Sequence, residues 1–179
     1  YFDYKHIADP LIDDSDSGFT AEKIRGIFFF FLKELIPFVK KVMENSAADD
    51  SCLKKYYSPS LQEQFNKQLI ESLGYDFNRG RMDTTHHPFM ISFAHGDVRI
   101  TTRYQEKYLA DSLFSTIHET GHAFYEMGND VSLDGTPLFG GTSSGVHESQ
   151  SRLWENIVGR SYGFWEYFYP KLQKFFPEQ

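Results

Sequence analysis

Three observations predict a mostly α-helical fold with one small antiparallel β hairpin. Apolar residues recur at helical spacing over most of the chain, whereas two short stretches alternate between apolar and polar residues. Hydrophobic residues make up 40% of the 179 residues and aromatic residues 17%, a composition that excludes a disordered chain. A chain of this length is long enough to bury one core, so we expect a single domain over residues 1–179.

The first part of the chain is predicted to be a loop followed by a helical segment. Residues 1–20 are polar and lack periodicity, whereas residues 20–74 carry two helical patterns. In the first pattern, "IFFFFL" at residues 27–32 is far shorter than the roughly 20 apolar residues of a membrane span, so it predicts a buried helix face. Pro37 should end or kink this helix. Ser58 and Pro59 begin the second helix, and Gly74 ends it.

The second part is predicted to hold the hairpin and two further helical regions. "HPFMISF" and "DVRITTRY", on either side of "AHG", predict a hairpin within residues 82–104. A helix over 105–128 and a Gly- and Ser-rich loop over 129–146 should follow. A helix and an aromatic tail occupy 147–176. Nothing obvious encloses that tail, so we expect it to be exposed and the chain to be part of a longer protein.

The charge, the apolar runs and the cysteine count limit the partners and the cellular compartment that the sequence predicts. The formal net charge is -7 with no basic cluster, which argues against a nucleic-acid partner. The absence of a long apolar run argues against a membrane partner. The single cysteine, Cys52, allows no internal disulfide, so we expect a reducing compartment, the cytoplasm.

The stretch "IHETGHAFYEMG" at residues 117–128 points to a metal. His118 and His122 are four residues apart, so they share one face of the predicted helix and could both bind one Zn²⁺. Glu119 could hold a water molecule beside the metal and accept its proton. Gly121 costs about 1 kcal/mol against alanine in a helix, so we expect another segment to approach closely there.

A third ligand decides whether such a site could be catalytic, because catalytic zinc keeps one position for water. The pattern HExxHxxGxxH fails here, since Tyr125 and Gly128 occupy its last two fixed positions. Glu148 and Glu155 both follow the loop and are seven residues apart, so they share a helix face. Residue spacing favours neither, and either could instead be a surface acid.

Four motifs in order resemble one family. "HPF" at 87–89, "DVRIT" at 97–101, "HETGH" at 118–122 and "HESQ" at 147–150 are similar to the motifs of the carboxypeptidase Taq family of zinc metallocarboxypeptidases. The resemblance implies a helical cleft fold with a small sheet beside the active site. It also implies Zn²⁺, or Co²⁺, on His118, His122 and Glu148, with Glu119 as the base.

The resemblance further implies a cytoplasmic homodimer that removes single residues from a peptide with a free C-terminus. Two later family motifs, which would bind the substrate carboxylate and stabilise the oxyanion, are absent, so we expect the fold to be incomplete. A zinc endopeptidase, or a catalytically silent zinc-binding fragment that acts as an interaction module, stays open. The motifs also contain residues that we expect to contact substrate or support the ligands: His87, Asp97, Arg99 and His147. Asp97 and Arg99 could equally pair with each other.

Overall fold

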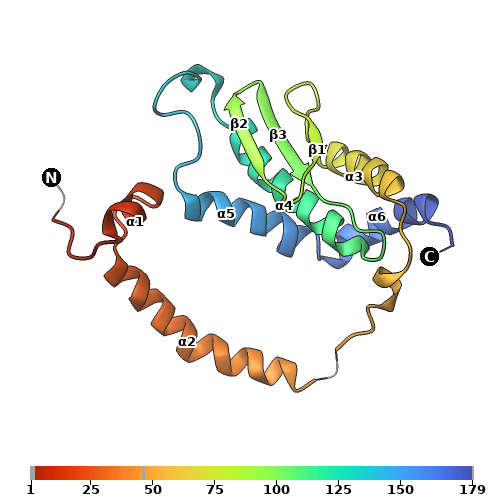
Figure 1. Ribbon diagram of the computed structural model, residues 1–179, viewed down its shortest axis with the longest axis horizontal. Helices are drawn as coiled ribbons and strands as arrows, with labels where there is room; N and C mark the ends of the chain where they lie inside the picture. Colours follow the sequence, from red (N-terminus) through yellow and green to blue (C-terminus); the bar gives the residue numbers. More distant parts are fainter. Residues whose placement is uncertain (1–2, 46, 179) are drawn as a thin grey trace. The chain divides into compact units, whose positions relative to one another are not determined.

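The computed structural model describes residues 3–45 and 47–178 and is mostly helical, as predicted (Figure 1). It divides into two compact units, residues 1–49 with 142–145, and residues 50–141 with 146–179. Its helices are α1 (Asp9–Ser15), α2 (Ala21–Met43), α3 (Pro59–Leu73), α4 (Leu109–Met127), α5 (Ser144–Arg152) and α6 (Tyr162–Phe175). Its strands are β1 (Met82–Thr84), β2 (Met90–Ala94) and β3 (Asp97–Thr102). Shorter helical segments are η1 (Ser51–Lys54), η2 (Val131–Leu133) and the π-helical η3 (Leu153–Val158).

The expectation of a loop over residues 1–20 is wrong for α1. Pro10 stands in the first turn of this helix, where its missing N–H costs nothing. The Asp9 carboxylate accepts hydrogen bonds from the backbone N–H groups of Lys5, His6 and Ala21 at 3.0, 2.9 and 2.8 Å. One carboxylate therefore joins the start of α1 to the start of α2.

Helix α2 begins where predicted but does not end at Pro37. The Thr20 side chain caps it by accepting from the Lys23 N–H at 3.3 Å. The helix continues through Pro37 to Met43. The surrounding residues are exposed, so water can hydrate the carbonyl that loses its donor, and the proline does not terminate the helix.

The expectation that "IFFFFL" is a buried helix face is also wrong. Phe28 and Phe29 are 59% and 72% exposed, and only Ala21 is buried in the whole of α2. Besides α2, the described residues of its own unit comprise the short helix α1, connecting loops and four residues around the start of α5, which is too little chain to form a second layer. In the part of the chain that the structure describes, no helix has the length and apolar character needed to cross a bilayer.

The second unit holds the predicted hairpin within a larger sheet. Strands β2 and β3 pair antiparallel, as expected, with a register irregularity between Ser92 and Ala94. Strand β1 adds in parallel on the other side of β3, giving the order β1-β3-β2. The sequence did not predict β1, because three residues show no alternation. Val98 and Ile100 of the central strand are fully buried in the core shared with α4.

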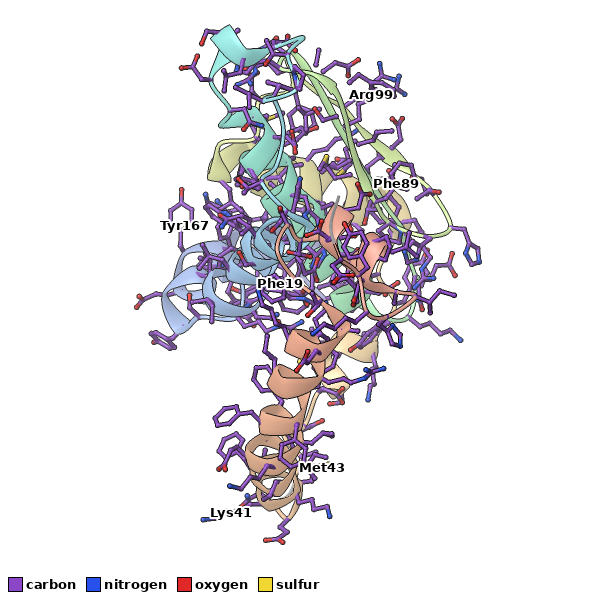
Figure 2. All side chains as sticks on the ribbon, turned by 90° about the vertical axis from the view of Figure 1, so that its left-hand side faces the viewer. Phe19, Lys41, Met43, Phe89, Arg99 and Tyr167 are labelled. Atoms are coloured by element: carbon purple, nitrogen blue, oxygen red, sulfur yellow. The ribbon has the colours of Figure 1, made fainter. Side chains whose placement is uncertain are left out.

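The aromatic tail is enclosed on one face, contrary to expectation. Phe164, Phe168 and Phe176 lie in the core, and Phe176 contacts the ring of Tyr57 at 5.0 Å between centroids. Tyr167 of α6 lies outside this core, is 59% exposed and points away from the ribbon (Figure 2). The tail therefore folds back onto the unit that contains it, and only its outer face stays open.

Candidate metal centre

Helix α4 carries the HETGH motif and passes very close to α5 at Gly121. A Cβ atom on Gly121 would lie 2.7 Å from the Ser151 Cα and 2.9 Å from the Gln150 carbonyl oxygen. Real Cβ contacts are not this short, so only glycine permits the crossing. The predicted close approach of another segment is thus confirmed. The crossing places the first residues of the HESQ motif beside the two histidines.

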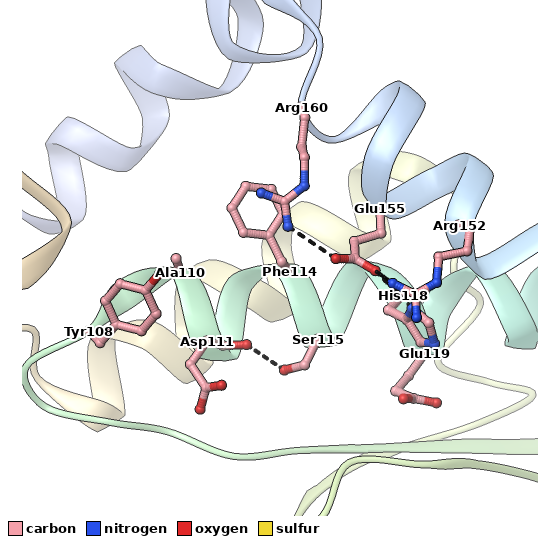
Figure 3. A pocket seen from close by; sticks show the side chains of 10 residues that line it. All are labelled: Tyr108, Ala110, Asp111, Phe114, Ser115, His118, Glu119, Arg152, Glu155 and Arg160. Carbon is pink, nitrogen blue, oxygen red and sulfur yellow. Dashed lines mark hydrogen bonds and ion pairs between the residues drawn. The ribbon is translucent and has the colours of Figure 1, made fainter. Parts of the chain in front are cut away.

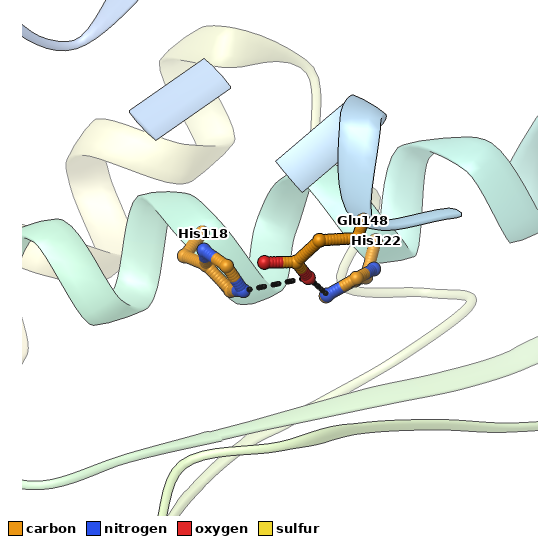
Figure 4. Close-up of side chains that lie close together, drawn as sticks. All are labelled: His118, His122 and Glu148. Atoms are coloured by element: carbon orange, nitrogen blue, oxygen red, sulfur yellow. Dashed lines mark ion pairs between the residues drawn. The ribbon is translucent and has the colours of Figure 1, made fainter. Parts of the chain in front are cut away.

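Three side chains from these two helices converge on one point (Figure 4). The Glu148 Oε2 atom lies 3.5 Å from the His118 Nε2 and 3.3 Å from the His122 Nε2. One ligand atom from each residue lies within 4.8 Å of the others. Two ligands bound at 2.0–2.1 Å to a tetrahedral zinc would lie about 3.4 Å apart. The spacing and the His₂Glu chemistry therefore fit a zinc-type ion.

Glu155, the other candidate third ligand, lies on the far side of His118. Its Oε2 atom is 2.9 Å from the His118 Nδ1, which is the nitrogen that does not face Glu148. Arg152 and Arg160 hold the Glu155 carboxylate at 3.2 and 3.0 Å. The π-helical η3, a local departure of the kind often found at functional sites, carries this residue. Glu155 is thus placed to orient a ligand and not to be one.

Glu148 divides its two oxygen atoms between two tasks. Oε2 faces the histidines, while Oε1 accepts from the Arg152 Nε at 2.8 Å. An ion pair with Arg152, four residues later on the same helix, is therefore present alongside the convergence on the histidines. Such second contacts fix the orientation of a carboxylate ligand.

Glu119 is buried beside the cluster, with 7% of its surface exposed. Burial raises the pKa of Glu119 to about 7, and nearby Glu148 adds to the rise while His118 opposes it. A cation bound beside it would favour the charged form and lower this pKa. A buried carboxyl group whose pKa lies near neutrality is suited to proton transfer.

A cavity of about 390 Å³ opens next to this cluster (Figure 3). Its lining includes the side chains of His118 and Glu119 and the aromatic rings of Tyr108 and Phe114. The guanidinium group of Arg160 lies 3.8 Å from the centre of the Phe114 ring, which closes one wall. The remaining lining residues are Ala110, Asp111, Ser115, Arg152 and Glu155.

His122 contacts His147, which the sequence predicted as a supporting residue, and His147 in turn contacts Glu126, which the sequence analysis did not predict. The Nδ1 atoms of His122 and His147 are 2.6 Å apart, and the His147 Nε2 lies 2.8 Å from the Glu126 Oε1. The hydrogen bond with His147 lowers the pKa of Glu126, and burial lowers the pKa of His122. Glu126 follows His122 by four residues, so the two share a helix face, and this spacing alone could have predicted Glu126 as a supporting residue.

The remaining predicted residues are Asp97, Arg99 and His87, whose roles in substrate contact stay predictions. Asp97 and Arg99 form a two-bond ion pair with each other, with both N···O distances 2.7 Å. Arg99 points outward from the sheet and lies 5.1 Å from the centre of the Phe93 ring (Figure 2). His87 is exposed in the bend before β2. None of these three residues is among the ten that line the cavity.

Known proteins similar to this chain in sequence and in structure are named carboxypeptidases. The chain is 41% identical to Carboxypeptidase 1 of Bacillus subtilis, covering 100% of the chain and 36% of that protein. It is 41% identical to Thermostable carboxypeptidase 1 of Thermus thermophilus, covering 97% of the chain and 34% of that protein. The crystal structure of an M32 carboxypeptidase from Deinococcus radiodurans R1 matches with a TM-score of 0.91 and 47% identity, covering 95% of the chain and 34% of that structure.

The chain spans about a third of the length of these relatives. The family described as "Carboxypeptidase Taq (M32) metallopeptidase" matches residues 3–179, which is nearly every residue of the sequence. Together with the four ordered motifs and the His₂Glu cluster, this match places the chain in the carboxypeptidase Taq (M32) family of metallopeptidases.

Proposed function

We propose that this chain carries the zinc centre of a carboxypeptidase that removes single residues from the free C-terminus of a peptide. The observation that carries the proposal is the convergence of the His118 and His122 Nε2 atoms on one Glu148 oxygen, with buried Glu119 next to them. Membership of a metallopeptidase family supports a metal at this point. The names of the relatives support the carboxypeptidase activity.

The residues present fit a zinc ion held by His118, His122 and Glu148. Two neutral imidazoles and one carboxylate leave a positive charge on the metal and one coordination position open, as catalytic zinc sites do. When bound, the metal would polarise the peptide carbonyl and lower the pKa of a water molecule. Co²⁺ is the second metal that the site could take, because it accepts the same nitrogen and oxygen ligands.

Glu119 acts as the general base and then as the general acid. It takes a proton from the attacking water as the oxygen bonds to the peptide carbonyl carbon. It then delivers that proton to the leaving amine as the C–N bond breaks, so one carboxylate serves both steps. The cavity beside Glu119 has an aromatic wall at Tyr108 and Phe114, which would accept an apolar part of the peptide.

Metal content tests the site and a single substitution tests the base. We expect His122→Ala to abolish stoichiometric zinc, measured by elemental analysis of the purified protein. Glu119→Gln should keep the zinc and lose hydrolysis by roughly 10²-fold or more, because the amide cannot accept a proton. Unchanged zinc in His122→Ala, or more than about a tenth of the activity in Glu119→Gln, would contradict these roles.

The free C-terminus is tested separately with a matched pair of peptides. An otherwise identical peptide with an amidated C-terminus should resist cleavage if the activity is that of a carboxypeptidase. Equal cleavage of both peptides would favour a zinc endopeptidase. Zinc binding with no cleavage of either would favour a silent zinc-binding module. The cytoplasmic location and the homodimer stay predictions from the family resemblance.

A further inference from the structure

His147 lies between a metal-ligand histidine and a buried carboxylate. It contacts His122 through Nδ1 at 2.6 Å and Glu126 through Nε2 at 2.8 Å. Glu126 is itself held, by the Gly141 backbone N–H at 3.1 Å and by the Asn129 side-chain N–H at 3.2 Å. The three side chains form a continuous chain of hydrogen bonds that ends at the nitrogen of His122 facing away from Glu148.

Only one arrangement of protons in this chain leaves His122 able to bind a metal. The ionised Glu126 carboxylate can only accept, so the Nε2 of His147 donates to it. A neutral His147 then has a lone pair on Nδ1, which accepts from the Nδ1–H of His122. The Nε2 of His122 is left with a lone pair, and that is the atom 3.3 Å from the Glu148 oxygen. The reverse arrangement would place a proton on this Nε2 and prevent ligation.

We propose that Glu126, acting through His147, is a positioning residue that fixes the tautomer and the ring orientation of His122. This inference rests on the proposed metal centre. The two ligand histidines would then be oriented by different means. His118 meets the Glu155 carboxylate directly at 2.9 Å, whereas His122 reaches a carboxylate only through a second imidazole.

The surrounding backbone supports a fixed place for His147. A Cβ atom on Gly141 would lie 2.6 Å from the His147 Cδ2 atom and 3.1 Å from the Tyr125 ring. The Tyr125 ring meets the His147 ring edge to face, with centroids 5.1 Å apart. The imidazole is therefore confined between a helix side chain and a loop glycine, and its rotation is restricted. Groups that orient a ligand in this way are typically worth 10–100-fold in metal affinity.

The test measures zinc affinity and the His122 tautomer in the full chain. We expect Glu126→Leu to weaken zinc binding by roughly 10–100-fold in competition with a chelator. In the metal-free chain, ¹⁵N NMR should show the Nδ1–H tautomer of His122, and Glu126→Leu should abolish this preference. Glu126→Gln should retain most of the zinc affinity and most of the preference for the Nδ1–H tautomer of His122, because its amide oxygen still accepts from His147. Glu166→Gln, an exposed acid on α6, is the matched control and should change neither.

Each outcome separates this inference from the proposed metal centre. Unchanged zinc affinity in Glu126→Leu would overturn the inference, and so would weaker affinity with an unchanged His122 tautomer. If Glu126→Leu does not fold, zinc affinity and the His122 tautomer are measured in Glu126→Gln and His147→Phe instead. Wild-type values of both in His147→Phe would overturn the inference. If the wild-type chain binds no zinc, the metal centre is wrong, and the tautomer in the metal-free chain still decides whether Glu126 orients His122.

Discussion

Helices α4 and α2 are both long and apolar, yet one is embedded in a core and the other is open. Twelve of the 19 residues of α4 are buried, whereas α2 has one buried residue among 23. Each has a glycine in its interior, Gly121 and Gly26. A Cβ atom would collide with α5 at Gly121 and would meet no atom within 4 Å at Gly26.

The difference between the two helices separates what a periodic pattern predicts from what it does not. Apolar residues at helical spacing predicted both helices, and both formed. Burial depends on a partner surface, which the sheet, α3 and η3 supply to α4. The described residues of the unit that contains α2 supply no such layer. Substitutions and pH titrations in the two units test the contrast between the buried helix α4 and the exposed helix α2.

The same leucine truncation should have very different effects in the two helices. Leu113 is fully buried in α4, so Leu113→Ala should lower the free energy of unfolding by about 2–5 kcal/mol. Leu32 in α2 is 59% exposed, so Leu32→Ala should change it by less than about 0.5 kcal/mol. Urea unfolding followed by tryptophan fluorescence and by far-UV circular dichroism measures both. A large cost for Leu32→Ala would show that α2 is covered in solution.

Stability of the metal-free chain should fall with rising pH because of Glu119. Its folded-state pKa is raised to about 7, so the fold favours the protonated form. The stability from this group is fully present below its ordinary value of 4.5 and is lost as the pH rises through about 7. The loss is at most about 3 kcal/mol. Urea midpoints at several pH values, with a chelator present, should slope for the wild type and be flatter for Glu119→Gln.

Adding one methyl group at the two helix glycines should have opposite signs. Gly121→Ala should destabilise the chain by about 1–3 kcal/mol, because the methyl group would push against the α5 backbone. It should also weaken zinc binding, since α5 carries Glu148. Gly26→Ala should stabilise α2 by up to about 1 kcal/mol through helix propensity alone. Melting temperatures test both, and a stabilising Gly121→Ala would contradict the close helix crossing.

The smallest effect should come from Asp9, whose pH dependence has the opposite sign to that of Glu119. The hydrogen bond from the Ala21 N–H, with that from His6, lowers the pKa of Asp9. The fold therefore favours the carboxylate, and its contribution is present above the ordinary value of 3.8 and is lost as the pH falls below it. The amide shift of Ala21 in NMR should move only at acidic pH. Asp9→Asn should abolish the pH-dependent change in the Ala21 amide shift. An unchanged pH dependence in this variant would contradict the hydrogen bond from the Ala21 N–H to Asp9.

Features that depend on neighbouring residues along the chain could be predicted from the sequence. The four-residue spacing of His118 and His122 places both on one face of any α-helix, whatever surrounds it. The helix that ends at Gly74 was predictable for the same reason, since the φ of 110° at this glycine is a local property that its missing side chain permits. The order of the four motifs was likewise sufficient to indicate the family, because that order is a property of the linear chain.

Features that depend on how elements pack required the three-dimensional fold. Glu148 and Glu155 are equivalent by spacing, and the crossing of α5 over Gly121 with the π-helical turn after it sends them to opposite nitrogens of His118. The chain of contacts from His122 to Glu126 joins residues of two helices and a loop. The exposure of α2 and the partial burial of α6 depend on which surfaces meet. Side-chain periodicity describes one element at a time and carries no information about its partner.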